Sequence, residues 1–140
     1  MRARESGIAA TGSVKALALA AVLTVLALVS VPAALANDDD VIRRGSCSAA
    51  SDWKVKLSPE NGRIEVEFEV DQNRNGDTWR VVMRRNGVVF FRGERVTQPP
   101  SGSFEVRRVI SNPAGSDTIV ARAVNLRTDE VCRGSATANF

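Results

Sequence analysis

The sequence predicts an all-β fold, a seven-stranded antiparallel sandwich. Three observations support this prediction. Apolar and charged residues alternate with a period of two in one segment after another, most clearly over residues 63–71. Clusters of Asn, Asp, Gly and Pro interrupt the alternation about every 8–12 residues, as turns between short strands do. Beyond residue 37, no segment shows the apolar period of an amphipathic helix.

The alternating segments give seven expected strands, at residues 53–58, 63–71, 78–85, 88–95, 103–110, 117–125 and 130–138. Between the third and the fourth, Asn86-Gly87 is a strong signal for a two-residue hairpin. Trp79 on the third strand stands where an immunoglobulin-like domain often places its core tryptophan. The cysteine pair of antibody domains, on the second and sixth strands, is absent. We therefore predict an immunoglobulin-like architecture without that disulfide.

The apolar positions of this alternation should face one another between the two sheets. They are Trp53, Val55, Leu57, Ile64, Val66, Phe68, Val70, Trp79, Val81, Met83, Phe104, Val106, Ile119, Ala121 and Ala123. Glu65, Glu67 and Glu69 occupy the alternate positions of the second strand and should face solvent. Carboxylates at this spacing would suit an inverting glycosidase, but we expect ordinary cross-strand ion pairs. The expected partners are Lys54, Lys56 and Arg107.

The first 36 residues have the pattern of a secretory signal peptide. Three basic residues precede an uncharged run at residues 16–31, and a small-x-small site follows at Ala34-Leu35-Ala36. We therefore expect a signal-peptide helix ahead of the sandwich, cleavage between Ala36 and Asn37, and a secreted, extracellular protein. The alternative is a retained anchor, although the run is shorter than the ~20 residues of a transmembrane helix. We expect no membrane span in the mature chain.

After cleavage we expect a flexible, polar N-terminal arm at residues 37–51 and one domain at residues 52–140. Two cysteines remain, Cys47 and Cys132. An even count in an oxidising compartment predicts a disulfide, and only one pairing exists. The alternative is two free, buried thiols.

Charge and composition exclude several functions. The whole chain has a net charge of +3, but residues 37–140 contain 16 basic and 15 acidic residues, so the mature domain is nearly neutral. Basic residues are not interleaved with aromatic ones, and we therefore expect no nucleic-acid partner. Histidine is absent, and no Gly-x-Ser-x-Gly motif occurs. Without the commonest general base or a nucleophile motif, we expect that the protein is not an enzyme.

The loop at residues 71–77 begins like a calcium-binding loop. Its candidate oxygen ligands are Asp71, Asn73, Asn75 and Asp77. The match then fails, because Val82 stands where a calcium loop of this kind needs a bidentate glutamate. The alternative is a loop in which Asn and Gly simply adopt turn conformations. We expect no cofactor apart from this possible calcium ion.

One outer sheet face combines arginine with exposed β-branched residues, a mixture that interfaces favour. Its predicted binding residues are Arg80, Val82, Arg84, Val120 and Arg122, and Val124 and Arg133 should lie beside them. We expect the partner to be a protein or an anionic polymer of the cell envelope. The alternative is an ordinary solvated sheet face with high strand propensity.

Three segments, at residues 63–76, 103–108 and 132–137, resemble a group of short actinobacterial secreted proteins without a known function. The resemblance covers most of residues 45–138. It implies an exported immunoglobulin- or fibronectin-III-like domain, and it implies no activity. We therefore expect a small exported binding module acting at the cell envelope or outside the cell. The alternative is a purely structural secreted domain, with or without a calcium ion.

Overall fold

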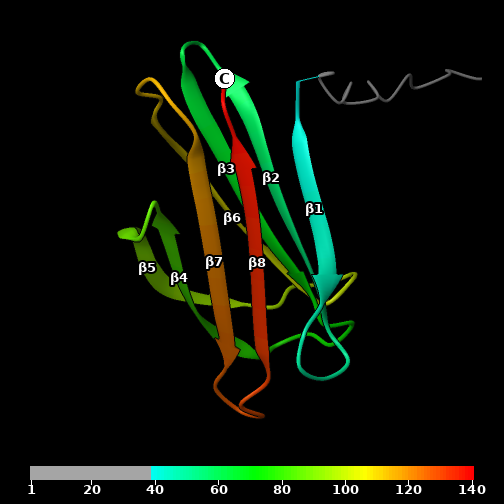
Figure 1. The fold of residues 1–140 in the computed structure, drawn as a ribbon. Helices are drawn as coiled ribbons and strands as arrows, with labels where there is room; N and C mark the ends of the chain where they lie inside the picture. Colours follow the sequence, from blue (N-terminus) through cyan, green and yellow to red (C-terminus); the bar gives the residue numbers. More distant parts are fainter. Residues whose placement is uncertain (1–38) are drawn as a thin grey trace, which may run out of the picture. The chain divides into compact units, whose positions relative to one another are not determined.

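The computed structural model describes residues 39–140. The predicted signal peptide and its cleavage site between Ala36 and Asn37 lie outside these residues. The described part is all-β and antiparallel, and it forms two four-stranded sheets (Figure 1). The strands are β1 (Val41–Ser46), β2 (Asp52–Glu60), β3 (Arg63–Asp71), β4 (Thr78–Arg85), β5 (Val88–Val96), β6 (Ser103–Ser111), β7 (Asp117–Asn125) and β8 (Val131–Ala138). Residues 39–140 include no helix that is long and apolar enough to cross a membrane.

The first sheet has the strand order β1-β2-β3-β6, and the second has the order β5-β4-β7-β8. The two sheets lie face to face with the apolar core between them. Figure 1 shows β7 and β8 side by side in the second sheet and β2 beside β3 in the first. Seven of the strands agree with the predicted segments to within one or two residues at each end.

The expected count of seven strands is wrong, because the structure has eight. The additional strand, β1, lies inside residues 37–51, which we expected to be a flexible arm. It pairs antiparallel with β2, from Val41 opposite Leu57 to Ser46 opposite Asp52. The segment escaped prediction because it lacks alternation. Ladder hydrogen bonds to a neighbouring strand hold it, and its sequence does not show them.

The predicted core is confirmed except at Trp53. The other fourteen predicted core side chains are all buried. Trp53 is half-buried and packs against the edge of the core. Its ring lies between Gly45 on β1 and Gly134 on β8, so close that a Cβ atom at either glycine would collide with it. The two glycines thus let one indole close the side of the sandwich where β1 and β8 meet.

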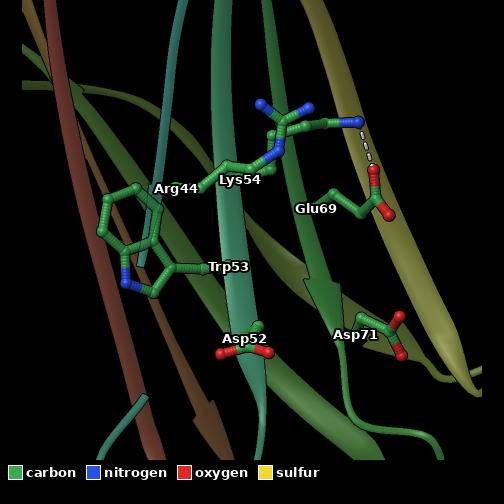
Figure 2. A pocket seen from close by; sticks show the side chains of 6 residues that line it. All are labelled: Arg44, Asp52, Trp53, Lys54, Glu69 and Asp71. Carbon is green, nitrogen blue, oxygen red and sulfur yellow. Dashed lines mark ion pairs between the residues drawn. The ribbon is translucent and has the colours of Figure 1, made fainter. Parts of the chain in front are cut away.

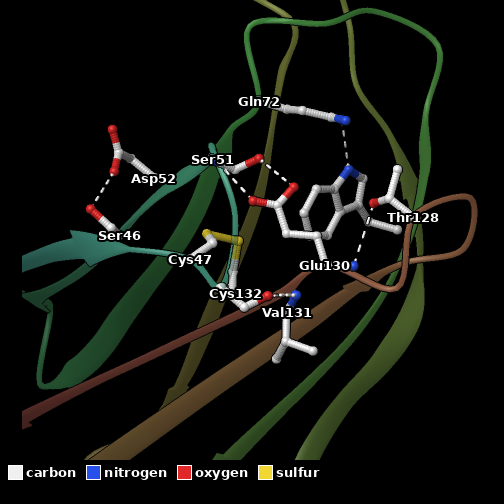
Figure 3. The surroundings of a disulfide bond; sticks show 11 residues. Ser46, Cys47, Ser51, Asp52, Gln72, Thr128, Glu130, Val131 and Cys132 are labelled. Atoms are coloured by element: carbon white, nitrogen blue, oxygen red, sulfur yellow. Dashed lines mark hydrogen bonds between the residues drawn. A yellow bond between two sulfur atoms is a disulfide. The ribbon is translucent and has the colours of Figure 1, made fainter.

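The predicted disulfide between Cys47 and Cys132 is confirmed, with the two Cα atoms 4.3 Å apart. It joins the end of β1 in the first sheet to β8 in the second (Figure 3). The buried carboxylate of Glu130 lies beside it and accepts hydrogen bonds from the backbone amide and hydroxyl of Ser51, at 2.8 and 3.0 Å. A disulfide at this position is compatible with an oxidising compartment outside the cytoplasm.

On the opposite side of the sandwich, the edge strands β5 and β6 carry two arginines at inward positions. Arg95 stands opposite Trp79, and Arg108 stands opposite Val66. Their guanidinium carbons lie 5.1 and 4.4 Å from the centroid of the Phe91 ring. Each distance is within the range of a cation–π contact. Inward charges on edge strands also discourage pairing with another chain.

Candidate functional site

The predicted arginine and valine positions of β4 and β7 share one outer face. Across the two strands, Arg80 stands opposite Val124, Val82 opposite Arg122, and Arg84 opposite Val120. Their sequence neighbours Val81, Met83 and Ala121 are fully buried, so the alternate positions point away from the core. The pairing produces a chequered surface in which every arginine of one strand lies beside a valine of the other.

The edge strands of the second sheet extend this surface. On β8, Arg133 stands directly opposite Arg122. On β5, Arg92 stands opposite Val82. We call the whole surface the arginine face; it consists of Arg80, Arg84, Arg92, Arg122 and Arg133 with Val82, Val120 and Val124.

Sequence reasoning missed Arg92, and a β-bulge explains why. The register between β4 and β5 shifts between Met83 and Arg84. Without this shift, the two-residue hairpin would place Arg92 opposite the buried Val81, on the inner side of the sheet. The only signal in the sequence is that alternation fails in the apolar run at residues 88–91, just before Arg92.

The charges of the arginine face are almost entirely uncompensated. The one acidic residue on the same side of this sheet is Glu94, which stands opposite Arg80 with 3.7 Å between their nearest charged atoms. Both side chains are more than half exposed, so this pair is weak. Within residues 39–140, the other four arginines of the face form no ion pair. Arg122 and Arg133 are directly opposite each other, an arrangement that costs stability when the charges are alike.

A hollow of about 310 Å³ lies on this face. It is lined by Arg84 from β4, Val120 and Arg122 from β7, Arg133 from β8 and Gly87 from the β4–β5 hairpin. Three arginine side chains therefore line one recess. Arginine presents a planar fork of donors that suits carboxylate and phosphate oxygens. The arrangement can bind an anion, and its valines offer apolar contact.

The outer face of the first sheet has a different charge pattern, and we call it the paired face. As expected, Lys54 forms an ion pair with Glu69, and Arg107 forms one with Glu65. The Lys56 ammonium lies 3.1 Å from the Asp40 carboxylate, and this contact raises the pKa of Lys56. Figure 2 shows the Lys54–Glu69 pair at a hollow of about 230 Å³, which Arg44, Asp52, Trp53 and Asp71 also line.

Glu65 is buried, although we expected it to face solvent. The register is nevertheless correct, because its neighbours Ile64 and Val66 are fully buried in the core. The Arg107 guanidinium instead covers Glu65 on the outer face, and this pairing lowers the pKa of Glu65. Burial, and the adjacent Glu65 carboxylate, raise the pKa of Glu67. Basic side chains and the neighbouring carboxylates thus determine the charge state of these glutamates.

The 71–77 loop adopts turn conformations. Asn73 has a φ of 56° and Gly76 a φ of 86°. The backbone amide of Asn73 donates a hydrogen bond to the Asp71 carboxylate at 3.1 Å, as in an Asx turn. Asn75 is exposed. Within residues 39–140, no three His, Cys, Asp or Glu side chains gather as a metal ion would require.

Asp77, the fourth candidate calcium ligand, already has its carboxylate oxygens occupied. Arg127 donates to both oxygens, at 2.9 and 2.6 Å. Asn125 donates at 3.0 Å and Gln72 at 2.6 Å, and Gln72 in turn accepts a hydrogen bond from the Trp79 indole. The Arg127 guanidinium, followed by Asn125, holds the pKa of Asp77 well below its usual range. Asp77 therefore anchors the loop to β7 and to the core tryptophan.

No family model, curated protein or solved structure matches this chain. The resemblance to short actinobacterial secreted proteins therefore stays a prediction. The class that the structure itself defines is an antiparallel β-sandwich with one disulfide between its sheets.

Proposed function

We propose that this protein is an exported, non-enzymatic binding module that holds an anionic polymer of the cell envelope on its arginine face. One observation carries the proposal: five arginines and a single glutamate share one outer sheet face, and four of these arginines have no ion-pair partner in residues 39–140. The domain as a whole is nearly neutral, so this charge is a local feature of one surface.

The paired face supports this interpretation over a purely structural role. Its strands carry both acids and bases, and ion pairs form between them, although Asp52 also stands opposite Asp71 and Glu69 opposite Glu105. The arginine face instead carries five arginines and one acid, and its excess positive charge lowers stability in the absence of a counter-charge. A partner that supplies negative charge removes this cost when it binds. A structural domain gains nothing from an uncompensated face.

The strand order also supports the immunoglobulin- or fibronectin-III-like type. In the letters of such domains, β2, β3 and β6 correspond to A, B and E, and β5, β4, β7 and β8 correspond to C′, C, F and G. The chain adds β1 outside strand A. Together with the disulfide and the predicted cleavage after Ala36, this arrangement suits a domain that works outside the cytoplasm.

The test is binding of the protein to cell-envelope fractions in increasing salt. Raising the ionic strength from about 0.01 to about 0.1 M shortens the Debye length from about 30 to about 10 Å, and binding should weaken accordingly. Replacing Arg84 and Arg122 together by serine should weaken binding about tenfold or more. The matched control replaces Arg44 and Arg63, two arginines of the first sheet, by serine. It removes the same charge and should bind nearly as the parent does.

Two outcomes would contradict the proposal. If the parent binds no envelope fraction at low salt, the arginine face is a solvated sheet face and the structural role gains. If both double variants lose binding equally, overall charge and not the arginine face determines the interaction. Capture of a protein in place of a polymer would reassign the partner.

A further inference from the structure

The hollow on the arginine face restricts the chemistry of a ligand more than the rest of the face does. Arg122 and Arg133 stand directly opposite each other on β7 and β8, and Arg84 stands on β4 opposite Val120, two residue pairs further along. Adjacent strands are about 4.8 Å apart. Side chains as long as arginine therefore reach a common point from three strands, and the three line one recess.

No acid competes for these three guanidinium groups. The charged residues on the rest of the face are Arg80, Arg92 and Glu94. Glu94 lies on the edge strand β5 and is paired with Arg80, away from the three strands that line the hollow. An anion in the hollow would thus be the first counter-charge that Arg84, Arg122 and Arg133 meet.

The number of donors favours phosphate over carboxylate. Each guanidinium offers a fork of two parallel N–H groups, and a carboxylate, with two oxygens and one negative charge, is matched by a single fork. A phosphate monoester offers three acceptor oxygens and a charge of about −1.5 to −2 at neutral pH. It can therefore accept from all three arginines and compensate more of their charge.

The size and the wall of the hollow point to more than a bare ion. Its volume of about 310 Å³ falls at the lower end of ligand pockets, which are typically about 300–1,000 Å³. Val120 provides an apolar wall beside the arginines. A sugar ring presents C–H groups to such a wall while its phosphate reaches the guanidinium groups. The recess thus has room for one phosphorylated sugar unit.

We infer that the hollow bounded by Arg84, Arg122 and Arg133 binds the phosphate group of a phosphorylated sugar unit in an envelope polymer. This inference rests on the proposed function, since it names the chemical group that the same face recognises.

Titration with small sugars, followed by NMR of the labelled protein, tests the inference. The probes are glucose 6-phosphate, glucuronate and glucose, which differ only in the group at carbon 6: a phosphate ester, a carboxylate or a hydroxyl. Glucose 6-phosphate should bind about tenfold or more tightly than glucuronate, and glucose should not bind. The largest shifts should occur at Val120, Arg122 and Arg133.

The pH dependence adds an independent signature. The second phosphate proton has a pKa of about 6, so affinity for glucose 6-phosphate should rise between about pH 5 and about pH 7. The chain contains no histidine that would give the same profile. Replacing Glu94, the acid of this face, by glutamine should leave the rise in place.

Variants locate the site. Replacing Arg122 by serine should lower the affinity for glucose 6-phosphate at least about tenfold. Replacing Arg92, on the same face but outside the hollow, by serine should change this affinity less than about threefold. Equal affinity for glucuronate, absence of glucose 6-phosphate binding, or equal losses in the two variants would overturn the inference. None of these results alters envelope binding by the arginine face, which is measured separately and tests the proposed function alone.

Discussion

The outer faces of the two sheets are built from the same kind of alternating strands but differ in their balance of charge: the paired face carries acids and bases together, and the arginine face carries arginines with one acid. On the paired face, Lys54 meets Glu69 and Arg107 meets Glu65. On the arginine face, Arg122 meets Arg133, another arginine. The difference teaches that strand alternation determines which side chains point outward. Whether the charges of neighbouring strands balance one another is a separate property. On the paired face the acids have bases nearby on the same face, whereas most arginines of the arginine face have no acid beside them, and a negatively charged partner is the simplest counter-charge for them.

The largest expected loss of stability comes from removing the charge of Asp77, a buried carboxylate whose oxygens all accept hydrogen bonds. Replacing Asp77 by asparagine keeps the shape of the side chain but removes the charge that Arg127, Asn125 and Gln72 bind. We expect the free energy of unfolding to fall by about 2 kcal/mol. The matched control, Glu94→Gln on the arginine face, should change it by less than about 0.5 kcal/mol. Urea unfolding measures both, and equal losses would contradict the contrast.

The Asp77 carboxylate should also make the stability of the protein depend on pH. The folded pKa of Asp77 lies below its unfolded value of about 3.9, so the folded state binds fewer protons. Its contribution to stability is therefore present above about pH 4 and is lost as pH falls through the folded pKa. Thermal unfolding between neutral pH and about pH 2 should show a smaller acid-induced loss for Asp77→Asn than for the parent. An identical loss would mean that other carboxylates dominate.

On the paired face, Glu65→Gln should have an intermediate effect. The change leaves a buried side chain without the charge that attracts Arg107. We expect a loss of about 1 kcal/mol, limited because the Arg107 side chain is exposed to solvent. Adding Arg107→Ser to the Glu65→Gln variant should lower the free energy of unfolding little further, because the ion pair is already lost. A double-mutant cycle measures this. Full additivity would mean that the two residues act independently.

The smallest effect, and one of opposite sign, is expected at Glu67. Its pKa is raised by burial and by Glu65, so its ionised form is disfavoured in the folded protein. Stability from this group is lost as pH rises through its unfolded and then its folded pKa. Glu67→Gln should therefore raise the melting temperature at pH 7 by about 2 °C or less, and the gain should vanish near pH 4. A lower melting temperature at pH 7 would contradict this account.

Most of the fold was predictable because the signals were local. Alternation over residues 63–71 and the Asn86-Gly87 hairpin each depend on a few neighbouring residues, and both agree with the structure. The disulfide was predictable because the sequence offers one pairing only. By contrast, β1 has no alternation and is held by its pairing with β2, which is a tertiary contact.

The candidate site was predictable on the central strands and not at the edges. Arg80, Arg84 and Arg122 follow from alternation on β4 and β7. Arg92 does not, because its outward direction depends on a bulge that sequence patterning does not reveal. The interactions of Asp77 were missed for a related reason. Its partners Asn125 and Arg127 are far away in the sequence and reach it only in the folded sandwich.

One substitution tests the central claim that the arginine face is left uncompensated for a partner. Val82 lies among Arg80, Arg84, Arg92 and Arg122, so a glutamate there would supply the missing counter-charge. Val82→Glu should unfold at a higher temperature than its neutral control Val82→Gln, because the new carboxylate relieves the repulsion between like charges. It should also bind envelope fractions about tenfold or more weakly than that control. Binding equal to the control, with no gain in stability, would contradict the account.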